Sequence, residues 1–175
     1  MHVKTVVLIA SALLAIAGCA TSSQPVSAMA PEGVTYIVVR HAEKATDDPR
    51  DPALSAAGQA RAEALARRFL TTRLTAAYAT AFKRTQQTAR PAATASGIAV
   101  TTYDASQPAA DFVAQLRQTH KRGHVLVVGH SNTVPGIVAS LCACTVAALD
   151  ESRYGDVYEV SIDDAGTAKL TESTY

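Results

Sequence analysis

The sequence has no tryptophan, an aromatic content of only 5% and a formal net charge of +1 over 175 residues. It contains no run of basic residues and no cluster of aromatic residues on which bases could stack, so we expect no nucleic-acid binding. It also lacks internal repeats. Because the overall charge is close to zero, any recognition of anions must come from local geometry rather than from a global electrostatic field.

The sequence also lacks an apolar run long enough to span a bilayer. The apolar stretch Thr5–Ala17, after the positively charged Met1–Lys4, has the length and flanks of a secretory signal peptide. It ends in Ile-Ala-Gly-Cys, which resembles a bacterial lipobox and implies cleavage before Cys19 and lipidation of its sulfur. We therefore predict a signal peptide (1–18) and a lipidated tether (19–33). The residue after Cys19 is alanine and not aspartate, so we expect the lipidated protein to be anchored at the periplasmic face of the outer membrane.

Only two further cysteines, Cys142 and Cys144, are present. An exported protein is permitted a disulfide, but two side chains at i and i+2 on a helix point nearly apart. We therefore interpret the pair as buried packing residues at the end of a helix.

From residue 34 to 175, β-branched apolar runs alternate with helical patterns, as is typical of a parallel sheet covered on both faces. We predict one α/β domain, a three-layer α/β/α sandwich with an antiparallel edge. A kink or break is expected at Pro91, and Asn132 is expected to cap a helix. The expected strands are 34–39, 74–79, 98–103, 124–128, 156–162 and 168–173, and the expected helices are 56–70, 85–96, 108–122 and 132–143.

Three of the expected strand ends carry cationic or imidazole side chains: Arg40 and His41 after the first, Arg84 after the second and His130 after the fourth. If these strands are parallel neighbours, the side chains converge at one edge of the sheet, where ligands bind in such folds. Arginine forks suit phosphate oxygens, and neighbouring positive charge favours a neutral, nucleophilic imidazole. The cluster therefore predicts a phosphate site.

At these residues the sequence resembles the histidine phosphatase superfamily, the group named for phosphoglycerate mutase. The resemblance implies that His41 is a nucleophile that forms a phosphohistidine, and that Arg40, Arg84 and His130 bind the phosphoryl oxygens. It implies no metal and no cofactor. The matching segments are Arg40–Lys44, Leu54–Ala60, Lys83–Ala89, Tyr103–Asp104 and Val128–Thr133.

The residue that protonates the leaving oxygen is less clear from the sequence. Members of the superfamily often place a carboxylate after the third strand, which is the position of Asp104. Asp111 and Glu43 are alternatives. Thr80 is expected to pack beside the site without taking part in the chemistry.

The leading functional hypothesis is a lipid-anchored phosphatase for phosphomonoesters or phosphohistidine, with a phosphorylated small molecule, glycan or protein as substrate. A phosphomutase is disfavoured because the connections Lys44–Ala53 and Ala105–Gln107 are too short to close over the site. The remaining alternative is a non-catalytic binder of phosphorylated envelope material. The sequence indicates neither the substrate nor the oligomeric state.

Overall fold

The computed structural model describes residues 1–2 and 33–175. The predicted lipidation site Cys19, most of the predicted signal peptide and nearly all of the tether lie outside the described residues. Among the described residues, no helix has the length and apolar character needed to cross a membrane.

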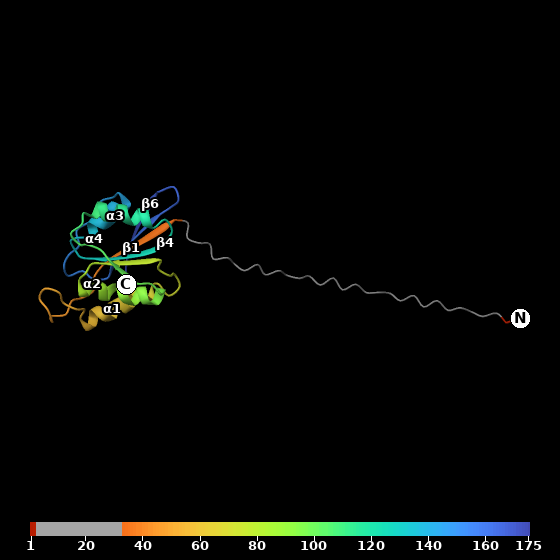
Figure 1. The fold of residues 1–175 in the computed structure, drawn as a ribbon, viewed down its shortest axis with the longest axis horizontal. Helices are drawn as coiled ribbons and strands as arrows, with labels where there is room; N and C mark the ends of the chain where they lie inside the picture. The colour runs from red at the N-terminus through yellow and green to blue at the C-terminus, as the bar shows by residue number, and fades with distance from the viewer. Residues whose placement is uncertain (3–32) are drawn as a thin grey trace.

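The described chain forms six strands and four helices in an α/β/α arrangement (Figure 1). The helices α1 and α2 cover one face of the sheet, and α3 and α4 cover the other. This confirms the predicted three-layer fold. In chain order the elements are β1 (Val34–Arg40), α1 (Ala56–Arg67), β2 (Ala76–Ala79), α2 (Lys83–Ser96), β3 (Val100–Thr102), α3 (Ala109–Thr119), β4 (Gly123–Gly129), α4 (Val134–Cys142), β5 (Asp156–Ile162) and β6 (Ala168–Thr174).

The sheet has the strand order β3-β2-β4-β1-β5-β6. The first four strands in this order run parallel, whereas β5 is antiparallel to β1 and to β6. The predicted antiparallel edge is therefore confirmed. In the register, Arg40 pairs with Gly129, and Ala79 pairs with Val128. The carboxyl ends of β1, β4 and β2 consequently lie side by side at one edge of the sheet.

The two central strands, β1 and β4, are apolar on both faces because both faces are covered by helices. Tyr36 and Val38 belong to the core under α3 and α4, whereas Ile37 and Val39 belong to the core under α1 and α2. All four side chains are at most 2% exposed. Burial of each such side chain contributes about 1.5–3 kcal/mol, so the strands that end at the site are among the most firmly held parts of the fold.

The structure contradicts the break predicted at Pro91 and the cap predicted at Asn132. The helix α2 continues through Pro91 without a break. Asn132 does not cap α4, because the chain first makes a turn in which the amides of Thr133 and Val134 donate to the carbonyl of His130, at 3.1 and 2.9 Å. The helix therefore begins at Val134, with Thr133 in the cap position.

The interpretation of Cys142 and Cys144 as packing residues was also wrong, since the two cysteines form a disulfide. The helix α4 ends at Cys142, and Ala143 adopts the left-handed conformation with φ of 52°. This reversal brings the two Cα atoms to 5.2 Å, within the usual range for a disulfide. The prediction failed because it assumed that both residues lie on one continuous helix.

Candidate active site

The sheet topology brings together the four side chains predicted to bind phosphate. Arg40 and His41 lie at the end of β1, Arg84 lies in the first turn of α2 after β2, and His130 follows β4. The rings of His41 and His130 meet edge to face, with centroids 5.4 Å apart. An Nη atom of Arg84 lies 3.5 Å from Nδ1 of His130. Three segments distant in sequence thus form one cluster.

His41 is buried, at 3% exposed, and its hydrogen bond fixes the state of its ring. Nδ1 lies 2.8 Å from the carbonyl oxygen of Ala42. A carbonyl oxygen can only accept, so Nδ1 carries the proton and Nε2 keeps its lone pair. Burial, together with His130 and the two arginines, lowers the pKa of His41 to about 3, against the opposing effect of the Ala42 hydrogen bond. The imidazole is therefore neutral at physiological pH and has a free nitrogen.

His130 is oriented by Thr80, whose hydroxyl lies 3.0 Å from Nε2. The same hydroxyl lies 2.8 Å from that of Thr85, so the contact is part of a buried network. Burial and the charge of Arg84 and Arg40 lower the pKa of His130 to about 4. His130 is therefore also neutral, and Thr80 has the supporting position that the sequence predicted.

Arg40 joins the end of β1 to the loop between α4 and β5. Its Nη1 donates to the carbonyl oxygens of Asp150, Glu151 and Arg153, at 3.2, 2.8 and 3.0 Å. Its guanidinium carbon lies 4.3 Å from the ring centre of Tyr154. Nε of Arg40 is buried without a hydrogen-bond partner in the described part of the chain. This donor is therefore unsatisfied within the described structure.

Arg84 is held less tightly than Arg40. Its guanidinium lies over the ring of Phe82, 4.3 Å from the centroid, and 3.8 Å from a carboxylate oxygen of Asp51. Its Nε is also buried and unpartnered among the described residues. Two arginines with unsatisfied donors beside neutral imidazoles form a site suited to an oxyanion.

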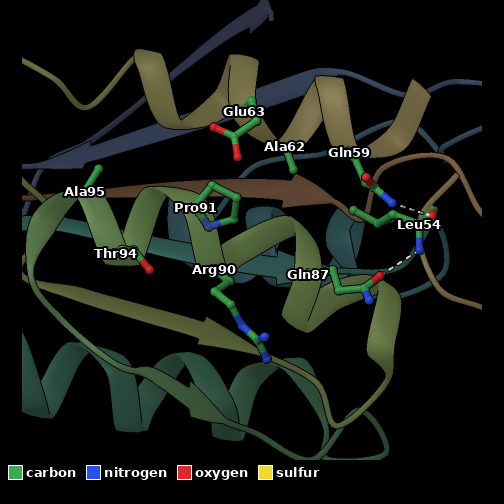
Figure 2. Close-up of a pocket in the computed structure, with 9 residues that line it drawn as sticks. All are labelled: Leu54, Gln59, Ala62, Glu63, Gln87, Arg90, Pro91, Thr94 and Ala95. Atoms are coloured by element: carbon green, nitrogen blue, oxygen red, sulfur yellow. Dashed lines mark hydrogen bonds between the residues drawn. The ribbon is translucent and has the colours of Figure 1, made fainter. Parts of the chain in front are cut away.

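The loop that carries Asp51 is fixed at its end by side chains of α1 and α2. Figure 2 shows Leu54 between Gln59 and Gln87: the Gln87 amide oxygen accepts from the Leu54 amide at 2.7 Å, and Gln59 donates to the Leu54 carbonyl at 3.4 Å. These residues line a cavity of about 600 Å³ between α1 and α2. The cavity contains none of the four side chains of the predicted phosphate site, so it is separate from the candidate site.

The three carboxylates predicted as proton donors do not contact this cluster. Asp104 is exposed and accepts hydrogen bonds from the amide and hydroxyl of Ser106, both at 2.8 Å. Asp111 is exposed in the first turn of α3. Glu43 accepts three hydrogen bonds from Arg61, at 2.6 to 2.8 Å, which hold the pKa of its carboxyl below the ordinary value.

The position of β3 explains why Asp104 is remote from His41. The strand β3 lies at the edge of the sheet, three places from β1. Since neighbouring strands are about 4.8 Å apart, strand spacing alone separates their ends by roughly 14 Å. The sequence predicts the strand, but it does not predict the place of the strand in the sheet.

The sequence analysis missed Glu151, Ser131 and Tyr154. The Glu151 carboxylate accepts from Nη2 of Arg40 at 3.1 Å and from the hydroxyl of Ser131. The Tyr154 ring lies 6.3 Å from that of His41. The loop 143–155 has no periodicity, so the only available signal was its position just before β5, the neighbour of β1. Among the described residues, no group of three or more His, Cys, Asp or Glu side chains could hold a metal ion.

The family described as "Histidine phosphatase superfamily (branch 1)" matches residues 36–107, which include Arg40, His41 and Arg84. The predicted resemblance to the histidine phosphatase superfamily is confirmed. His130 lies beyond the matched segment and enters the site through β4.

Solved structures share the histidine phosphatase fold at low sequence identity. The protein histidine phosphatase SixA in complex with tungstate is 18% identical over 80% of this chain and 96% of its own, with a TM-score of 0.62. YhfR of Bacillus stearothermophilus is 16% identical over 79% of this chain and 95% of its own, with a TM-score of 0.64. A mycobacterial glucosyl-3-phosphoglycerate phosphatase in complex with vanadate is 15% identical over 81% and 98%, with a TM-score of 0.60. No match was found among curated proteins.

Proposed function

We propose that the protein is a phosphatase that hydrolyses phosphomonoesters or phosphohistidine through a covalent phosphohistidine on Nε2 of His41. The observation that carries the proposal is the state of the His41 ring. Its Nδ1 donates to the Ala42 carbonyl and its pKa is lowered to about 3, so the ring is a neutral nucleophile beside two arginine cations.

In the proposed first step, the lone pair of Nε2 attacks phosphorus in line with the leaving oxygen. Arg40 and Arg84 offer buried Nε donors to the phosphoryl oxygens, and His130 borders the same space. Their fixed positions stabilise the negative charge of the transition state without reorganisation. Water then attacks the phosphohistidine and releases inorganic phosphate. The arginines supply the positive charge, so the proposal includes no metal.

The substrate is proposed at the level of class. SixA is described as a protein histidine phosphatase, and the mycobacterial relative is a phosphatase of a phosphorylated sugar acid. Both were solved with an oxyanion, tungstate or vanadate, which is consistent with an anion site in this fold. These likenesses support a phosphorylated protein, glycan or small molecule as the substrate of this chain.

Location at the cell envelope through a lipid on Cys19 is also a proposal, supported by the lipobox-like sequence that ends at this residue. Cells supplied with labelled fatty acid should yield labelled native protein and unlabelled Cys19→Ser protein. An unmodified Cys19 in the native mature protein, found by mass spectrometry, would overturn the anchor.

The experiment that tests the activity is steady-state hydrolysis of p-nitrophenyl phosphate and phosphohistidine by the purified protein. We expect turnover of at least one substrate by the wild type and none by His41→Ala. His124→Gln is the matched control, because His124 lies near the opposite end of β4. Binding of vanadate without any hydrolysis would instead support the non-catalytic binder.

A further inference from the structure

The loop between α4 and β5 places a carboxylate against the groups proposed to bind phosphate. One oxygen of Glu151 accepts from Nη2 of Arg40 at 3.1 Å, and the other accepts from the hydroxyl of Ser131, the residue after His130. The backbone of Glu151 is fixed as well, because its carbonyl accepts from Nη1 of Arg40 at 2.8 Å. The side chain itself is 75% exposed. The main chain is thus anchored, and the carboxylate is hydrogen-bonded to the site while it remains open to solvent.

Sheet topology explains why this carboxylate reaches the site. The strand β5 is hydrogen-bonded to β1, and its first residues lie opposite the end of β1, where Val157 pairs with Val39. The preceding loop must therefore pass the end of β1, where Arg40 and His41 stand. The loop after β3, which carries Asp104, lies at the far edge of the parallel strands.

The electrostatic coupling of Glu151 agrees with this placement. Its charge raises the pKa of His130, and Ser131 and Arg40 hold the pKa of Glu151 below its ordinary value. Asp51, the other carboxylate beside a proposed phosphate ligand, is 3.8 Å from Arg84, and one of its oxygens already accepts from the Lys83 amide at 2.9 Å. Asp51 thus supports the start of α2, whereas Glu151 contacts Arg40 and the residue that follows His130.

We propose that Glu151 is a catalytic residue that transfers a proton in both halves of the hydrolysis. The inference rests on the proposed phosphatase function. In the first half, Nε2 of His41 forms the N–P bond as the P–O bond to the leaving group breaks. The carboxyl of Glu151 gives its proton to the departing oxygen, so that an alcohol and a carboxylate result.

In the second half, a water oxygen attacks phosphorus, and the electron pair of the N–P bond returns to Nε2. The Glu151 carboxylate takes the proton that the water loses and passes it to the inorganic phosphate, which leaves as the monoanion, so the carboxylate of the free enzyme is restored. The proton for the first half arrives with the substrate, since phosphate esters bind partly as monoanions near neutral pH. When phosphoryl oxygens take over Nη2 of Arg40, the carboxylate loses its ion pair and gains a neighbouring negative charge, and both changes favour its protonation.

The two halves predict different kinetics for Glu151→Gln on two esters. A nitrophenolate leaves without protonation, so the variant should release a burst of nitrophenol equal to the enzyme concentration and then turn over slowly. An alkoxide needs the proton, so glycerol 2-phosphate should show no burst and a kcat roughly 10²–10⁴-fold lower than that of the wild type. Asp104→Asn is the matched control, with wild-type kinetics on both esters.

The outcomes separate this inference from the proposed function. If the wild type hydrolyses neither ester and no phosphohistidine, the phosphatase function and the role of Glu151 are both overturned. If it hydrolyses phosphohistidine but neither ester, only the role of Glu151 is overturned. If the wild type hydrolyses both and Glu151→Gln matches it, or loses the same factor on both without a burst, only the role of Glu151 is overturned. A burst in Asp104→Asn instead would assign the proton transfer to Asp104. Thermal unfolding of each variant checks that the fold is retained.

Discussion

Two regions of the molecule form the site, and they differ in how they are built. The junctions after β1 and β4 end strands that are buried on both faces, so Arg40, His41 and His130 are only 3%, 3% and 8% exposed. The loop 143–155 has no regular structure, and its Glu151 is 75% exposed. The two regions meet at Arg40, which gives three hydrogen bonds to loop carbonyls. The junctions hold buried side chains, whereas the loop brings a solvent-exposed carboxylate to the same cluster.

The two arginines provide the strongest test of this difference. Arg40→Ala and Arg84→Ala should each lower kcat by roughly 10²–10³-fold, because each removes a preorganised donor. Only Arg40→Ala should also destabilise the fold, by roughly 3–5 kcal/mol, since it removes a buried cation and leaves three loop carbonyls without a donor. Arg84 has one long ion pair, so its loss should cost less than about 1 kcal/mol.

Kinetics and urea unfolding of the two variants would measure both effects. Equal losses of stability would contradict the view that Arg40 joins the junction to the loop while Arg84 serves the anion alone.

The difference between the strand-end junctions and the loop 143–155 also determines which site residues could be predicted from the sequence. The junctions follow apolar strands, so the pattern could place Arg40, His41, Arg84 and His130 just after strand ends, and at one edge of the sheet if those strands are parallel neighbours. Glu151 lies 111 positions from Arg40 and belongs to no periodic segment. Its place depends on β5 pairing with β1, a long-range pairing that local patterns do not encode. The cysteine pair was misjudged for a similar reason, because the left-handed turn at Ala143 has no sequence signal such as glycine.

The buried histidines predict a second, smaller effect, an acid-sensitive stability. The pKa values of His41 and His130 are lowered to about 3 and about 4, below the ordinary 6.5. Both stay neutral in the folded protein, whereas the unfolded chain takes up protons below pH 6.5. Stability is therefore fully present above that pH and is lost as the pH falls toward 4. Between pH 7 and pH 5, each histidine should lower the free energy of unfolding by about 2 kcal/mol.

Urea unfolding at the two pH values measures this loss, and His41→Asn and His130→Asn should each reduce it. His120 and His124 also have lowered pKa values, so part of the pH dependence should remain in the double variant. A stability that is the same at both pH values in the wild type would show that the site histidines are not held neutral by burial.

The smallest expected effect concerns the start of the loop. The disulfide between Cys142 and Cys144 closes a very short ring, so it removes little entropy from the unfolded chain. Replacing both cysteines by serine should lower the free energy of unfolding by less than about 2 kcal/mol and leave kcat unchanged. A large loss of activity would indicate that the disulfide controls the position of Glu151. The hydrogen bonds from Arg40 would then not be sufficient to hold the loop in place.

The central claim is that His41 is a neutral nucleophile that accepts the phosphoryl group. The most direct measurement is mass spectrometry of the protein quenched in alkali, which preserves phosphohistidine, during turnover of p-nitrophenyl phosphate. The account predicts one added phosphoryl group, located on His41 by fragmentation, absent from His41→Ala and increased in Glu151→Gln. Turnover without any phosphoprotein, or a phosphoryl group on another residue, would contradict it.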